Sequence, residues 1–404
     1  MGTMFSFFAK AAASSAISGY AAHNLLLSSS LSSRPARMAV TGIASFAGLA
    51  YYMKVWIQEY YFDWSYNDKR DLTGRTAVVT GGTLGGLGYA AAEVLYRQGA
   101  KVIITVRTKE KGQAAMKQME DRASSPVDDS RVSYVLCDFL SESSVRNCAA
   151  EIKSKTSGGI DFLVLNAGIS GRQGSKASAK QKDSAGVEDK VKTNHAAKVW
   201  MTNHVGPWIF AQELMPLLIQ AAKGNPLERP RVVWVASGAH KRASIDWEDP
   251  FHLKRTSGGS SYGQSKLANI MHAREYQKRV RDLLRNESGD NKTNGTLDVK
   301  CFPITPGLVW TALIPKIRVL YPLFWLIMRS PTMGAQVIKM ACLDNDLKGG
   351  EYLSNCYVKE SQGVDGCSND EEQWKRLWEL TAKQVEEKEY EKVIEISNAD
   401  KKTI

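Results

Sequence analysis

The sequence has little cysteine and no cysteine motif. Six cysteines are scattered through 404 residues without a CxxC pair, which argues against a disulfide scaffold or a structural metal site and favours buried thiols. Collagen-like and heptad repeats are missing too. Apolar residues make up 43% and charged residues 24%, so wholesale disorder and a multi-span membrane protein are excluded. No helix-turn-helix or RNA-binding signature occurs, and no nucleic-acid partner is expected.

Acidic residues are missing from the first 58 positions, which contain four basic residues. Residues 1–37 are rich in Ser, Ala and Leu, as is typical of a targeting or disordered tail. Residues 38–58 include Met38–Ile57, which is apolar except for Lys54 and long enough to span a hydrocarbon core of about 30 Å. We expect a membrane anchor here, with a cleaved presequence or an interfacial helix as alternatives.

Beyond this segment, residues 71–395 predict a single enlarged α/β domain. Short apolar runs alternate with amphipathic stretches, which indicates a parallel sheet covered on both faces. Right-handed crossovers then favour a doubly wound, Rossmann-type topology. Strands are expected at 76–80, 102–106, 132–136, 162–165, 232–236 and 297–304. Helices are expected around 88–98, 109–120, 142–155, 199–222 and 262–285.

Positive charge gathers outside this pattern. The formal net charge is +11, and residues 171–204 contain seven basic and three acidic residues. The polar stretch 170–198 reads as a long Lys-rich loop. Together with the basic N-terminal segment it favours an anionic ligand or membrane lipid as a partner, or else a solvated surface.

A glycine-rich sequence, GGTLGGLG over 81–88, follows the first expected strand and opens a helix. Glycine backbones can turn tightly and approach a pyrophosphate, whose charge the helix N-terminus stabilises. We assign cofactor contacts to Gly82, Gly86, Leu87 and Gly88. The second strand ends in Arg107 where NAD-binding folds carry an acid, and a guanidinium suits a 2′-phosphate. The predicted cofactor is therefore NADP(H).

Further polar pieces follow later strands in a fixed order. These are Asn166-Ala167-Gly168, Thr202-Asn203-His204-Val205-Gly206, Ser237, and Tyr262-Gly263-Gln264-Ser265-Lys266. Tyr262 and Lys266 are four residues apart and share a helix face.

The chain contains, in this order, the motifs GGTLGGLG, LCDF, NAG, TNHVG, WVASGAH, YGQSKLAN and ITPGLVWT. With these motifs it resembles the short-chain dehydrogenase/reductase family over roughly residues 72–382. TNHVG, SKLAN and KRLWEL are most similar to its retinol dehydrogenase-like branch, which includes the WW-domain oxidoreductases.

This resemblance implies a catalytic tetrad of Asn203, Ser237, Tyr262 and Lys266. It also implies that Asp138, Asn166 and Pro306-Gly307 border the bound cofactor, and we include Ala167, Gly168, Tyr262 and Lys266 among the cofactor contacts. A carbonyl reduced by hydride needs a proton, which a phenol supplies, and a nearby ammonium favours the phenolate in the reverse direction. Ser237 can stabilise the developing oxyanion.

Two departures from the family pattern concern the backbone. One residue is inserted in the glycine loop before Gly86, unless Gly82 takes the second glycine position. Pro303 lies in a strand expected to be interior, where a missing N–H is costly.

The substrate is expected to be a lipophilic carbonyl or alcohol such as a retinoid, sterol or lipid aldehyde. The apolar run Val319–Met328 falls, by resemblance, at the substrate lid. It is predicted either as an interfacial helix or as a helix packed on the core or against a second copy in a homodimer. Association with the endoplasmic reticulum or another organelle membrane is expected, with the catalytic domain facing a cytosol-like compartment.

Two alternatives stay open. One is a light-dependent protochlorophyllide reductase, although no cysteine follows Lys266 closely. The other is a membrane-tethered NADPH-binding scaffold or sensor with vestigial catalysis.

Overall fold

The structure is a computed structural model that describes residues 34–56, 65–122, 131–170, 195–225, 228–251, 261–287, 297–311, 327–361 and 363–388. Several predicted segments lie outside these residues in whole or large part. They are the tail 1–33, the Lys-rich loop 171–194, the apolar lid 312–326 and the end of the chain after 388.

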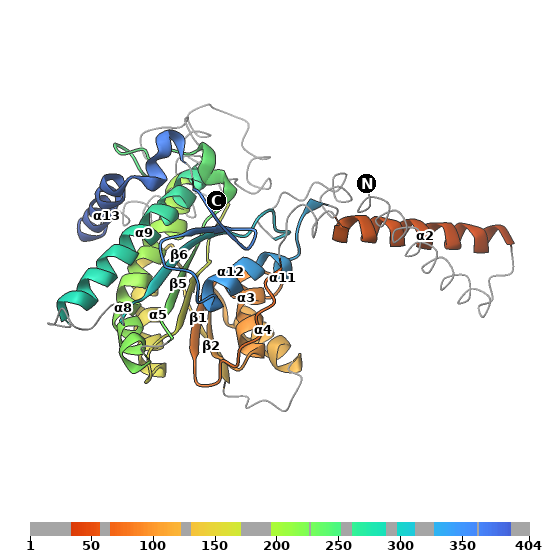
Figure 1. Cartoon of the computed structure of the whole chain (residues 1–404), viewed down its shortest axis with the longest axis horizontal. Helices are drawn as coiled ribbons and strands as arrows, with labels where there is room; N and C mark the ends of the chain where they lie inside the picture. The colour runs from red at the N-terminus through yellow and green to blue at the C-terminus, as the bar shows by residue number, and fades with distance from the viewer. Residues whose placement is uncertain are drawn as a thin grey trace, which may run out of the picture.

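The centre of the molecule is one sheet with strand order β3-β2-β1-β4-β5-β6-β7-β8 (Figure 1). All neighbouring strands are parallel except β7 and β8, which form an antiparallel edge. This order confirms the doubly wound Rossmann-type prediction. The strands are β1 Thr76–Thr80, β2 Lys101–Val106, β3 Val132–Leu136, β4 Phe162–Leu165, β5 Arg231–Val235, β6 Lys300–Thr305, β7 Tyr352–Ser354 and β8 Tyr357–Lys359.

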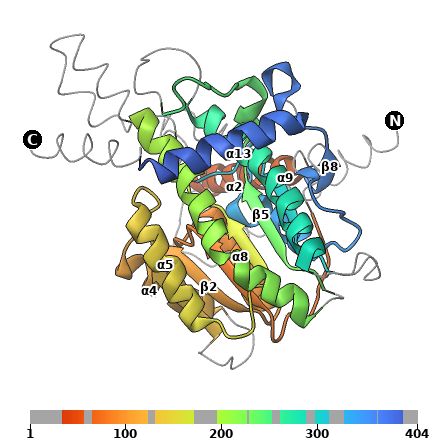
Figure 2. The same cartoon turned by 90° about the vertical axis from the view of Figure 1, so that its left-hand side faces the viewer.

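Helices cover both faces of the sheet. One face carries α3 Leu87–Arg97, α4 Lys109–Asp121, α11 Pro331–Gly334 and α12 Gln336–Leu343. The other carries α5 Glu142–Lys155, α8 Gly206–Gly224 and α9 Ser261–Glu287, and α13 Glu371–Glu386 packs on α9 (Figures 1 and 2). Three short helices complete the described elements: η3 Met201–Val205, η4 Gly238–Arg242 and η6 Val364–Asn369.

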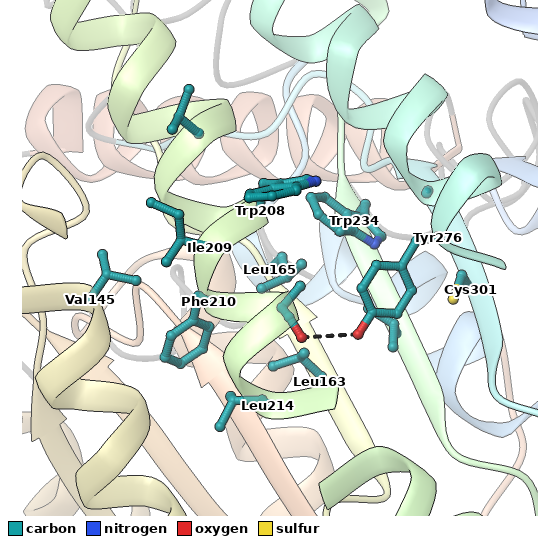
Figure 3. Close-up of a cluster of buried hydrophobic side chains, with 14 of the residues drawn as sticks. Val145, Leu163, Leu165, Trp208, Ile209, Phe210, Leu214, Trp234, Tyr276 and Cys301 are labelled. Atoms are coloured by element: carbon teal, nitrogen blue, oxygen red, sulfur yellow. Dashed lines mark hydrogen bonds between the residues drawn. The ribbon is translucent and has the colours of Figure 1, made fainter. Parts of the chain in front are cut away.

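The core beneath α8 and α9 is rich in aromatic side chains (Figure 3). Trp234 of β5 and Tyr276 of α9 meet edge to face with ring centroids 6.2 Å apart. The Tyr276 hydroxyl donates to the Ala211 carbonyl at 2.9 Å, so its polar atom is satisfied inside the core. Burial of these strands on both faces explains their continuously apolar sequences.

Pro303 fits inside β6 because of the direction its backbone faces. The Lys300 N–H donates toward β5, and backbone direction alternates along a strand, so position 303 faces β7. The pairing of β6 with β7 begins only at Ile304. The missing N–H therefore removes no bond from the sheet, and the cost expected from the sequence does not arise.

Helix α2, Arg34–Trp56, forms within the predicted anchor region and stands outside the layered domain (Figure 1). No helix among the described residues is both long and apolar enough to cross a membrane. The anchor prediction for residues 38–58 is therefore not supported by the structure.

Candidate active site

The glycine loop lies at the carboxyl ends of β1 and β4, where the strand order reverses. Gly81 has a φ of +71°, a backbone conformation that side chains rarely adopt. A Cβ on Gly88 would lie 2.4 Å from Asn166 Nδ2, and one on Gly82 would lie 2.6 Å from Ile104 Cβ. Close backbone packing therefore requires glycine at all three positions.

The N-terminus of α3 faces this loop. Gly86 is its N-cap residue and Leu87 its first helical residue, and no side chain caps the helix. The first N–H groups of a helix have no partner within it and attract anions. Glycine backbone beside an uncapped helix N-terminus fits the pyrophosphate of a dinucleotide.

Asn166 fixes the spacing between β1 and β4. Its Nδ2 donates to the Thr80 carbonyl at 2.9 Å, and the Thr80 hydroxyl accepts from the N–H groups of Asn166 and Ala167 at 2.8 and 2.9 Å. Asn166 thus supports the loop through the protein backbone. Thr80, which the sequence analysis did not single out, thus connects β1 to the end of β4 through its carbonyl and its hydroxyl.

Arg107 and Asp138 follow β2 and β3 at the same edge of the sheet, and both are exposed. Asp138 Oδ1 accepts from the Leu140 N–H at 3.1 Å, which holds its carboxylate at the start of the loop before α5. Arg107 makes no ion pair or hydrogen bond within the described part of the chain. Its guanidinium is available to a ligand bound at the glycine loop.

Asn203 lies in the π-helical turn η3, directly before α8. It is fully buried. Its Oδ1 accepts from the Ile169 N–H at 2.7 Å, while Nδ2 donates to the Ile169 carbonyl at 2.9 Å and to Ser265 Oγ at 3.1 Å. Such π-turns occur often at functional sites. Here the turn joins the segment after β4 to the helix α9 that carries Tyr262.

Lys266 extends from α9 toward the end of β5. Its Nζ donates to the Val235 carbonyl at 2.9 Å and lies 5.7 Å from the centre of the Tyr262 ring. A Cβ on Gly168 would lie 3.0 Å from Asn203 Oδ1 and 3.5 Å from Lys266 Nζ. The structure therefore brings Gly168, Asn203, Tyr262 and Lys266 into one cluster, although they are distant in sequence.

Ser237 completes this cluster from the end of β5. It is the N-cap of η4, its Oγ accepts from the Ala239 N–H at 3.3 Å, and its hydroxyl is close enough to Tyr262 to lower the pKa of that phenol. Burial raises the pKa of Tyr262, and the Ser237 hydroxyl opposes this rise. Burial lowers the pKa of Lys266 to about 8. At neutral pH the phenol keeps its proton beside a cationic lysine.

Pro306 and Gly307 follow β6 and are held by Arg329, which the sequence analysis missed. Arg329 Nη1 donates to the Pro306 carbonyl at 3.2 Å, and Gly307 has a φ of +80°. A Cβ on Gly307 would lie 2.8 Å from Arg329 Nη1. No sequence motif marks Arg329, because its role depends on its pairing with Val309, twenty residues earlier in the chain.

Comparison with known proteins agrees with this arrangement. The profile of the family described as short chain dehydrogenase matches residues 75–244. The human protein named Dehydrogenase/reductase SDR family member 13 is 31% identical over 325 residues, which cover 77% of this chain and 73% of the relative. Human polyprenol dehydrogenase is 28% identical over 319 residues, covering 76% of this chain and 85% of that protein.

A solved structure of an uncharacterized protein from Mycobacterium paratuberculosis has the same fold. Its TM-score is 0.53 at 24% identity, and the match covers 79% of this chain and 96% of that one. The chain belongs to the short-chain dehydrogenase/reductase family, whose members are oxidoreductases that act on alcohol or carbonyl groups with a nicotinamide cofactor. The family resemblance seen in the motifs is confirmed, and these relatives support its retinol dehydrogenase-like branch.

Proposed function

We propose that this chain is an NADP(H)-dependent oxidoreductase for a lipophilic carbonyl/alcohol pair, with Tyr262 as general acid or base. The observation that carries the proposal is the cluster of Ser237, Tyr262 and Lys266 beside Asn203. This cluster lies at the same edge of the sheet as the glycine loop. These residues supply a proton donor, a nearby cation and a hydrogen-bonding hydroxyl.

Each residue has a separate task in this mechanism. The bound nicotinamide supplies or accepts the hydride. Tyr262, whose raised pKa keeps it protonated, donates its hydroxyl proton to the oxygen that becomes the alcohol. The Lys266 ammonium, whose Nζ lies 5.7 Å from the centre of the Tyr262 ring, limits the cost of the phenolate that remains. Ser237 holds the tyrosine and the substrate oxygen in line.

The cofactor would be held by residues at the carboxyl edge of the sheet. The pyrophosphate would lie against Gly82, Gly86, Leu87 and Gly88. The nicotinamide end would lie toward Asn166, Ala167, Gly168, Pro306 and Gly307. Asp138 borders the adenine end. Arg107 would select NADPH, because an exposed guanidinium at the end of β2 can donate two hydrogen bonds to a 2′-phosphate.

A lipophilic substrate is supported by two observations. The sequence that follows Gly307 contains the apolar run Val319–Met328. A relative of which the match covers 85%, human polyprenol dehydrogenase, bears the name of a lipid alcohol. We also propose lipid-surface association through α2, whose side chains Met38, Ile43 and Phe46 are largely exposed.

The test is turnover by the full chain with NADPH or NADP+ and a panel of lipophilic aldehydes, ketones and alcohols. We expect oxidation of NADPH with at least one apolar carbonyl and weak turnover of small polar ones. Cofactor binding without turnover across the panel would contradict the proposal and favour an NADPH-binding scaffold. Turnover of protochlorophyllide only under illumination would favour the light-dependent alternative.

Association with lipid is tested separately by flotation with anionic liposomes. We expect the full chain to float, and Phe46→Asp to reduce the floating fraction several-fold. Equal flotation of both proteins, or of neither, would contradict the role given to α2.

A further inference from the structure

Four arginines surround a small cavity at the amino edge of the sheet, opposite the candidate active site. Arg75 precedes β1, Arg231 begins β5, and Arg70 and Arg229 complete the set. Asn345 and Glu228 also line the cavity. It is large enough for one water-sized group.

Arg231 has an unsatisfied donor at this place. Arg231 is 3% exposed, and its Nη2 donates to Asn345 Oδ1 at 3.1 Å. Nη1 is buried and has no hydrogen-bond partner among the described residues. A buried donor of a charged group that lacks a partner costs more than an ordinary unpaired group. The unpaired nitrogen thus indicates an acceptor that the described part of the chain does not provide.

Three nearby carboxylates are engaged by the other arginines. Asp161 and Glu228 lie 3.0 and 2.9 Å from Arg75, and Asp68 lies 3.0 Å from Arg70. No described ion pair includes Arg231. Its charge is stabilised by the Asn345 amide, by the Phe302 ring, whose centre is 5.7 Å from Cζ, and at longer range by the Asp344 carboxylate.

The surroundings of Arg231 agree with a missing negative charge. Burial lowers the pKa of Arg231 to about 10, and the neighbouring Arg70 and Arg229 act in the same direction. Asp344 and Cys342 oppose them. Arg231 still carries its proton at neutral pH, so the cavity wall is cationic under all ordinary conditions.

We propose that this cavity binds one small inorganic anion of chloride size against the guanidinium of Arg231. The available room suits a monatomic ion and excludes a whole phosphate. The bound ion would accept the unpaired hydrogen bond and join the start of β5 to the segment around Asn345. Because the site exists only in the folded chain, the ion would stabilise the fold by mass action.

The experiment measures the Tm of the full chain at constant ionic strength while potassium chloride replaces potassium gluconate, whose anion is too large to enter. We expect a rise that follows the logarithm of the chloride concentration and reaches roughly 4 °C when chloride exceeds its Kd about a hundredfold. Arg231→Met should abolish the chloride dependence. Arg122→Gln, at a surface ion pair with Glu93, is the matched control and should retain it.

A second measurement does not depend on any variant. Crystals grown with bromide should show anomalous density beside Arg231 Nη1. Equal Tm values of the wild type in chloride and gluconate would overturn the proposal, as would a cavity without bromide or a chloride dependence that survives in Arg231→Met. If Arg231→Met does not fold, the wild-type titration and the bromide position decide the question.

Discussion

Both edges of the sheet bury a cation, but the two cations are surrounded differently. Lys266, at the carboxyl edge, is 4% exposed and donates to a backbone carbonyl, and no described ion pair includes it. Arg231, at the amino edge, lies among arginines whose carboxylate partners are already paired. The pKa of Lys266 falls to about 8, whereas that of Arg231 falls only to about 10.

A buried cation therefore has a different consequence at each edge of the sheet. A lysine buried beside a phenol has a pKa near the working pH, so it can tune a proton transfer. An arginine keeps its charge at all ordinary pH values and can only be satisfied by a partner. Changes at the carboxyl edge should therefore affect chemistry, whereas changes at the amino edge should affect stability alone.

The largest expected effect is that of Tyr262→Phe. Loss of the hydroxyl removes the proton donor, so kcat should fall about 10³-fold, while the Kd for NADPH stays within about twofold. Steady-state rates and fluorescence titration of the cofactor measure the two quantities. An equal loss of cofactor affinity and rate would give Tyr262 a structural role.

Lys266→Met should change how stability depends on pH. Folding lowers the pKa of Lys266 from 10.5 to about 8, so the folded chain binds fewer protons than the unfolded chain between these values. Wild-type stability should therefore rise with pH across this window, removing a penalty of about 3 kcal/mol that is fully present below pH 8.

Urea denaturation of wild type and Lys266→Met at pH 7, 8 and 10 tests this. The free energy of unfolding of the wild type should improve relative to the variant as the pH rises. Lys278→Met, which removes an exposed lysine paired with Glu371, should follow the wild type. A constant difference between wild type and Lys266→Met would contradict the shifted pKa.

Arg107→Asp should turn cofactor preference toward NADH. It removes the attraction for a 2′-phosphate and introduces an acceptor for the ribose hydroxyls, so the ratio of kcat/KM for NADPH over NADH should fall about 10²-fold. Arg97→Asp, on the far end of α3, is a control that should leave the ratio unchanged. A wild type without preference would make Arg107 a bystander.

Asp161→Asn tests the amino edge. Asp161 pairs with Arg75 and accepts the Thr76 N–H at 2.7 Å. Loss of its charge should lower the free energy of unfolding by about 2 kcal/mol, because Glu228 still neutralises part of Arg75. The kcat of the folded fraction should not change. A fall in kcat without loss of stability would break the division between the two edges.

Thr381→Val should have the smallest effect. Thr381 Oγ1 lies 3.1 Å from Nε2 of the buried His204, which neighbours Asn203 in the π-turn. We expect a loss of about 1 kcal/mol in the free energy of unfolding. Thr381→Ser, which keeps the hydroxyl, should retain most of that energy. A loss in Thr381→Ser with none in Thr381→Val would instead assign the stabilisation to packing of the methyl group.

Local sequence was enough to predict the parallel sheet. The runs at Thr76–Thr80, Val132–Leu136 and Phe162–Leu165 have the predicted bounds. Interior strands β1 and β4 are buried on both faces and so must be apolar, whereas the edge strand β3 is partly exposed. Strands β7 and β8 escaped prediction since three residues give no periodic signal. The ordered strand-end motifs likewise placed Ser237 and Tyr262 at one edge.

The sequence by itself determined the fold class and the residue types at the candidate site, because a strand's ending and a helix's spacing are local properties. Only the tertiary structure decided that Asn203 lies in a π-turn, that Arg329 returns to hold Pro306, and that Arg231 lacks a partner for Nη1. Each of these depends on contacts between segments distant along the chain. Whether a buried polar atom is satisfied is set by what folding brings beside it, which no local pattern records.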